Sequence, residues 1–183
     1  SDIKGTDWFY LDVAKSYELG LMEGRGNAIF DPNGSVTVAE AITVAARIYE
    51  IASKSETKIG TAAEGDAWYK PYVDYAIASG IIKSDEYADY NAKATRSVIA
   101  QIFAKATPEG FLANINKFDG LIPDVKTTDA AYNAVLGLYN AGILTGVDNT
   151  YKFNPDAEIK RCEMSAIINR IAMPASRIKV ASK

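Results

Sequence analysis

Apolar side chains recur at positions i, i+4 and i+8 in three separate segments of the chain. This spacing places such side chains on one face of a helix. Three helices are therefore predicted, with the stripes Phe9-Val13-Tyr17, Tyr69-Val73-Ile77 and Ala131-Val135-Tyr139. A glycine follows each stripe by three residues, at Gly20, Gly80 and Gly142. A helix commonly ends in a left-handed residue, so each glycine is expected to close its helix.

A second helix is predicted after each of these segments. Its apolar residues fall at the same four offsets each time: Ala41-Val44-Ala45-Ile48, Ile99-Ile102-Phe103-Ala106 and Met164-Ile167-Ile168-Ile171. The chain therefore reads as three diverged copies of one helix–loop–helix unit, at 1–53, 61–107 and 121–174. One helix pair cannot bury its apolar faces alone, so the copies are expected to pack together as one compact all-α domain.

The loop inside each unit is kept in two copies and altered in one. The first and third copies carry Phe30-Asp31-Pro32 and Phe153-Asn154-Pro155, preceded by turn-forming Gly, Asn and Asp. This motif predicts an apolar plug followed by an extended residue before the proline. The second copy has Ala92 where the others have proline, so a different loop shape is expected there.

The start of the second helix carries a capping motif that differs between copies. Thr37 and Glu40 form the pattern of a capping box, in which each side chain bonds the other residue's backbone amide. The second copy keeps the cap as Thr95 without the acid, and the third keeps the acid as Glu163 without the threonine.

Arg96 and Arg161 stand at the first position of the second and third of these helices, where the first copy has Val38. The helix dipole disfavours a cation there. A guanidinium beside free helix amides is nevertheless a good receptor for a carboxylate or phosphate. Spacing leaves open the other interpretation, in which each arginine pairs with a nearby Asp or Glu.

Composition narrows the classes of function. The 183 residues are 48% hydrophobic and 23% charged, with a net charge of −3, which is typical of a soluble globular protein without general attraction to nucleic acid. No apolar run approaches the roughly 18–20 residues of a membrane span. Histidine is absent and Cys162 is the sole cysteine, which removes the commonest general base and any internal disulfide. We therefore expect a binding protein, with no catalysis, cofactor or metal site.

The ordered motifs resemble the S-layer homology family. Its repeat has Phe-x-Asp-Val, Trp, a helix, Gly-Ile, Gly, Phe-x-Pro and Thr-Arg-Ala-Glu. This chain shows Trp8, Gly20-Leu21, Phe30-Asp31-Pro32 and Thr37-Val38-Ala39-Glu40, and later Pro123-Asp124-Val125, Gly142-Ile143, Phe153-Asn154-Pro155 and Lys160-Arg161-Cys162-Glu163. The resemblance covers nearly the whole chain, in three copies.

The resemblance implies a pseudo-threefold helical bundle with grooves between the repeats. It also implies a secreted, cell-wall or S-layer protein, anchored without covalent bonds through a secondary cell-wall polysaccharide that carries pyruvylated N-acetylmannosamine. In the family, the arginine of Thr-Arg-Ala-Glu contacts the pyruvate carboxylate. By position this role falls to Arg96 and Arg161, with Lys160 as a possible reinforcement, so at most two grooves are expected to be competent.

Other interpretations stay open beside this one. Trp8 and Trp68 can stack on sugar rings or pack between repeats. Asp2 and Asp124 are expected to cap the first helix or its preceding turn, and Cys162 to be a buried small residue. Peptidoglycan itself, or another protein chain in an assembly, are the alternative partners; the isolated domain is expected to be a monomer.

Overall fold

The computed structural model describes residues 2–53 and 57–180. Within these residues the elements are helices, and the extended segments meet only in isolated bridges. In chain order they are α1 (Tyr10–Glu18), α2 (Val38–Ser53), α3 (Lys70–Ala78), α4 (Arg96–Ala106), α5 (Tyr132–Asn140) and α6 (Arg161–Ala172), with short 3-10 turns at Glu109–Phe111 and Pro174–Ser176. The predicted all-α fold is confirmed.

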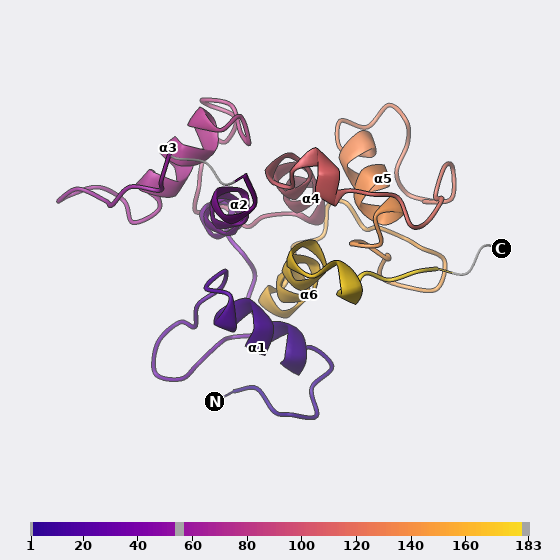
Figure 1. Cartoon of the computed structure of the whole chain (residues 1–183), viewed down its shortest axis with the longest axis horizontal. Helices are drawn as coiled ribbons and strands as arrows, with labels where there is room; N and C mark the ends of the chain where they lie inside the picture. Colours follow the sequence, from indigo (N-terminus) through magenta and orange to yellow (C-terminus); the bar gives the residue numbers. More distant parts are fainter. Residues whose placement is uncertain (1, 54–56, 181–183) are drawn as a thin grey trace.

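The second helix of each unit lies near the centre of the molecule, and the first helices lie around it. Figure 1 shows α2, α4 and α6 nearly end-on at the centre, with α3 beside α2, α5 beside α4 and α1 beside α6. Each first helix thus packs on the second helix of the preceding unit. Because α1 packs on α6, the N-terminal and C-terminal units are joined and the bundle closes into a ring.

Backbone hydrogen bonds close the same ring at its centre. The amide of Val36 donates to the carbonyl of Ile159 (3.1 Å), Ile159 donates to Ala94 (3.2 Å), and Ala94 donates back to Val36 (2.8 Å). The three residues precede α2, α6 and α4, and all are fully buried. Buried amides and carbonyls need partners, and each of these takes its partner from a different unit. The bundle therefore has pseudo-threefold symmetry down to its backbone.

The predicted stripes account for most of the core. All twelve residues of the second-helix stripes are buried. Of the nine first-helix stripe residues, six are buried, Tyr69 and Ile77 are half-buried, and Tyr17 is exposed over 66% of its surface. The equivalent Tyr139 is covered by Phe118, whose ring centroid lies 5.0 Å away. No aromatic contact of this kind reaches Tyr17 within the described residues.

The glycines close their helices as predicted, whereas the loops differ from expectation. Gly20, Gly80 and Gly142 have φ of 66°, 72° and 72°, the left-handed conformation that follows a helix end. The residue before proline in each Phe-x-Pro motif is not extended: Asp31 and Asn154 have φ of 59° and 61°. Asp and Asn tolerate this region better than other side chains, which explains their presence.

Candidate functional site

The loops of the first and third repeats are held by an aspartate from the segment before the first helix. The carboxylate of Asp2 accepts hydrogen bonds from the amides of Phe30 (2.8 Å) and Asp31 (2.7 Å). Asp124 accepts in the same way from Phe153 (2.8 Å) and Asn154 (2.7 Å). These aspartates are structural, but they bind the loop rather than capping the first helix, because the two loop amides offer them adjacent donors.

Asp2 gives the fold a pH dependence that can be measured. Hydrogen bonding from the Phe30 amide lowers the pKa of Asp2 below its usual 3.8. Its contribution to stability is therefore complete above the unfolded pKa and is lost as the pH falls through the lower folded value. We expect thermal unfolding between about pH 6 and pH 2 to show a smaller acid-induced loss in Asp2→Asn than in the wild type. Asp119→Asn, at an exposed position away from this contact, should follow the wild type; an Asp2→Asn curve parallel to wild type would contradict the assignment.

Arg161 is a buried arginine that joins the third repeat to the first. All three of its guanidinium nitrogens donate: Nε to the carbonyl of Phe30 (2.8 Å), Nη1 to Oε1 of Glu40 (3.3 Å) and Nη2 to the carbonyl of Glu23 (2.6 Å). The guanidinium also lies over the Phe30 ring, 4.7 Å from its centroid. Burial lowers the pKa of Arg161, which the Glu40 carboxylate partly offsets.

Arg96 occupies the equivalent place between the second and third repeats. Its Nε donates to the carbonyl of Phe153 (2.7 Å), and its guanidinium lies 5.3 Å from the Phe153 ring centroid. Nη1 forms an ion pair with Oε1 of Glu163 at 3.7 Å, too long for a hydrogen bond. Both arginines thus also follow the alternative prediction of pairing with an acid, each with one from the next repeat.

The first amides of α4 and α6 are not free, which corrects the expected receptor geometry. Arg96 and Ser97 donate their backbone N–H groups to the carbonyls of Ala157 and Pro155 (both 2.9 Å), and Arg161 donates to Gly34 (3.0 Å). The neighbouring loop occupies these donors because it forms the bridge that closes the ring. Any anion bound here is therefore held by side chains rather than by the first amides of the helix.

Two grooves between repeats contain these arginines. The Arg161 groove, of about 380 Å³, is lined by Leu21, Met22, Glu23, Gly24, Arg25, Glu40, Thr43, Val44, Arg47, Trp68, Arg161 and Met164. The Arg96 groove, of about 250 Å³, is lined by Trp8, Arg96, Leu144, Thr145, Gly146, Val147, Glu163, Ala166, Ile167 and Arg170. Most of these residues correspond one to one by repeat position. Each groove combines one tryptophan, one buried arginine, one motif glutamate and a second arginine on the central helix.

Both tryptophans are exposed. Trp8 is 66% and Trp68 54% accessible, and each makes an edge-on ring contact with the aromatic residue that follows it, Phe9 or Tyr69. Large apolar side chains on a soluble surface commonly mark a binding site when they gather with polar groups in a groove. Packing between repeats, the alternative prediction, does not bury them.

The third inter-repeat position lacks these groups. Ala130 stands where the other repeats have tryptophan, Val38 where they have the buried arginine, and Val98 where they have the motif glutamate. Lys105 replaces the second arginine and pairs with Glu86 at 3.6 Å. The scaffold is kept here, whereas the candidate binding groups are not.

The remaining motif residues either cap a helix or lie outside the two grooves. Thr37 and Glu40 make both hydrogen bonds of a capping box, and Thr95 caps α4 by accepting from Val98 (3.3 Å). Glu163 accepts from the Lys160 amide (2.9 Å). Lys160 itself is exposed, outside both groove linings, with Nζ near Oδ1 of Asn33 (3.4 Å). Cys162 is buried, and burial raises the pKa of its thiol.

Three groove arginines were missed from the sequence: Arg25, Arg47 and Arg170. Arg47 and Arg170 occupy the same repeat position, and both donate to the backbone that follows a helix-ending glycine, at Leu21 (3.4 Å) and Ile143 (3.0 Å). Each lies seven residues after the glutamate of the capping motif, Glu40 or Glu163, so an alignment of the repeats would have revealed both. Arg25 has no counterpart, because Val147 stands in its place.

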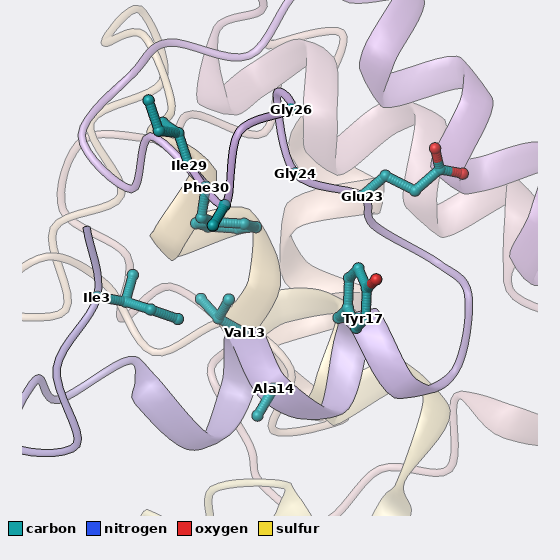
Figure 2. Close-up of a pocket in the computed structure, with 10 residues that line it drawn as sticks. Ile3, Val13, Ala14, Tyr17, Glu23, Gly24, Gly26, Ile29 and Phe30 are labelled. Carbon is teal, nitrogen blue, oxygen red and sulfur yellow. The ribbon is translucent and has the colours of Figure 1, made fainter. Parts of the chain in front are cut away.

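A larger pocket, of about 640 Å³, lies within the first repeat and is mainly apolar. Figure 2 shows Ile3, Val13 and Phe30 around it, while the carboxylate of Glu23 points away. In the third repeat the corresponding space is filled by Phe118, packed on Tyr139 and Tyr151. The pocket offers few polar groups to a ligand, so the grooves are the better candidate site.

Comparison with known proteins agrees with the repeat architecture. Residues 1–42 and 121–165 match the S-layer homology domain. The first and third repeats are therefore S-layer homology repeats. The middle repeat is not part of that match, and the boundaries of all three repeats stay a prediction based on the repeated pattern.

The chain is also similar to segments of large surface proteins and enzymes. It is 29% identical over 110 residues to the Surface-layer 125 kDa protein of Lysinibacillus sphaericus, and 31% identical over 122 residues to Exoglucanase XynX of Acetivibrio thermocellus. It is 26% identical over 106 residues to S-layer protein sap of Bacillus anthracis. These matches cover 57%, 63% and 57% of this chain but only 9%, 11% and 13% of the relatives. The chain therefore corresponds to about a tenth of their length.

The family sets the general role. S-layer homology domains are non-catalytic modules that anchor proteins to the cell wall by binding its polymers, and the protein is accordingly a secreted, cell-surface protein associated with the wall. No helix within residues 2–53 and 57–180 has the length and apolar character needed to cross a membrane.

Proposed function

We propose that the protein binds a pyruvylated secondary cell-wall polysaccharide in one or both of its arginine grooves and thereby anchors a larger surface polypeptide to the wall. The observation that supports this most is the pairing, in each groove, of an exposed tryptophan with a buried arginine. A flat aromatic surface suits a sugar ring, and a guanidinium suits the carboxylate of a pyruvyl group. The third position lacks both, so the proposal allows at most two sites in each chain.

The direct test is sedimentation with purified cell walls. We expect the protein to bind intact walls and to lose this binding once the pyruvyl groups have been removed from the polymer. Walls stripped of the whole polymer by acid form the second arm, because they leave peptidoglycan exposed. Binding that survives stripping would identify peptidoglycan as the ligand. Absence of binding, together with concentration-dependent light scattering, would instead indicate a protein assembly module.

The tryptophans offer a variant that leaves the core intact. The double substitution Trp8→Ala and Trp68→Ala is expected to weaken binding to pyruvylated polymer by roughly 2- to 10-fold, because a ring contact contributes about 0.5–1.5 kcal/mol. Leu11→Ala is the matched control, since Leu11 is 76% exposed on α1 outside both grooves. Calorimetry gives the dissociation constants; equal affinity of the double variant and the control would contradict a role in sugar binding.

A further inference from the structure

The two grooves differ in how far their buried arginine is already engaged. All three nitrogens of Arg161 donate to protein acceptors, whereas only Nε of Arg96 makes a hydrogen bond within the described residues. The carbonyl of Glu23, which accepts from Arg161, has its counterpart at Thr145, and Arg96 does not bond that carbonyl. Both terminal nitrogens of Arg96, which lines the groove, are therefore free of hydrogen bonds to the described residues, and Nη1 has only the 3.7 Å ion pair with Glu163.

The acidic partners differ in the same sense. Glu40 is held on both oxygens: Oε1 is 3.3 Å from Arg25 and from Arg161, and Oε2 accepts from the Thr37 amide at 2.8 Å. Oε2 of Glu163 accepts in the same way from the Lys160 amide at 2.9 Å, but its Oε1 has, among the described residues, only the 3.7 Å ion pair with Arg96. A carboxylate ligand would have to break short ion pairs in the Arg161 groove but not in the Arg96 groove.

Charge balance favours the Arg96 groove as well. In the Arg161 groove, every arginine has a close carboxylate: Arg25 with Asp31 (3.0 Å) and Glu40 (3.3 Å), Arg47 with Glu23 (2.7 Å), and Arg161 with Glu40 (3.3 Å). In the Arg96 groove, Thr145 replaces Glu23, and Arg170 forms no ion pair with the described part of the chain. The acidic group that acts electrostatically on Arg170 is Asp12, whose carboxylate accepts a hydrogen bond from Asn169 (2.6 Å).

We propose that the Arg96 groove, with Arg96 and Arg170 as its cations, is the carboxylate-binding site of this chain, and that Arg161 is a structural residue that joins the third repeat to the first. The ranking rests on the proposed function, because it assumes a carboxylate-bearing sugar as ligand. Trp8 is then the tryptophan that contacts the sugar. One chain binds one such sugar residue with high affinity.

The test is calorimetry with a pyruvylated N-acetylmannosamine glycoside and its pyruvyl-free analogue. The wild type is expected to bind one pyruvylated glycoside. Arg96→Gln should weaken binding by about 10- to 100-fold, as expected for lost hydrogen bonds to a charged group. Arg161→Gln, measured at a temperature where circular dichroism shows it folded, should change the dissociation constant less than about threefold.

A matched exchange in the groove lining leaves the buried arginines and the apolar core unchanged. Thr145→Glu places into the Arg96 groove the carboxylate that Glu23 supplies in the other, and should weaken binding about 10-fold or more. Glu23→Thr makes the reverse change and should leave the affinity unaltered. Two equal sites in the wild type, or loss of binding in Arg161→Gln and Glu23→Thr but not in the Arg96 groove variants, would overturn the ranking. Failure of the wild type to bind the pyruvylated glycoside at all would refute the proposed function itself.

Discussion

Replacing Phe103 by alanine is expected to lower the free energy of unfolding by about 3–5 kcal/mol, the usual cost of deleting a buried aromatic side chain. Phe103 is fully buried on α4, the central helix that packs against both α2 and α5. Its removal leaves a cavity in the core beside a helix that contacts helices of both other repeats. The expected fall in melting temperature is roughly 6–20 °C for a chain of this size.

Phe111→Ala is the matched control for this cavity. Phe111 is 42% exposed in the connector after α4, so its loss should cost within about 0.5 kcal/mol. Denaturant unfolding of both variants, followed by circular dichroism, measures the difference. Equal destabilisation of the two would show that α4 does not form the centre of the bundle.

Arg161→Met is expected to destabilise the protein by on the order of 3 kcal/mol, because breaking a buried charged contact leaves its partners unsatisfied. Methionine keeps much of the apolar length of the side chain over Phe30 but makes none of the three hydrogen bonds. The carbonyls of Phe30 and Glu23 lose a donor, while Glu40 keeps Arg25.

Arg96→Met provides the comparison, since the two arginines share a position and differ in their contacts. Arg96 makes one hydrogen bond and one longer ion pair, so a loss of about half that of Arg161→Met is expected. Calorimetric unfolding at one pH and salt concentration measures both. A larger loss in Arg96→Met would contradict the structural role given to Arg161.

The stripes of the second helices could be predicted from the sequence because helical periodicity is a local property. Ile99, Ile102 and Phe103 show their common face by spacing alone, and all are buried as expected. The choice of partner is not local. Nothing in the pattern of α1 indicates that it packs on α6 rather than on the α2 of its own repeat, because both neighbours offer an apolar face.

The arginines and tryptophans of the candidate site could be predicted from the sequence, but the partners of each guanidinium group could not. Arg96, Arg161, Trp8 and Trp68 stand out by repeat position, and the structure brings one tryptophan and one arginine into each groove. The engagement of each guanidinium depends on residues more than fifty positions away, such as Phe153 for Arg96 and Phe30 for Arg161. Equal motifs therefore gave no way to rank the grooves.

The contact of α1 with α6 joins helices from opposite ends of the chain, so this part of the core depends on contacts that are distant in sequence. During export, α1 emerges long before α6 if the N-terminus leads, and its apolar face has no partner until the third repeat has followed. The last backbone hydrogen bonds of the ring, those of Ile159, likewise wait for the third repeat. The closed bundle can therefore form only when all three repeats are present together, and because each groove takes residues from more than one repeat, neither groove exists before that point.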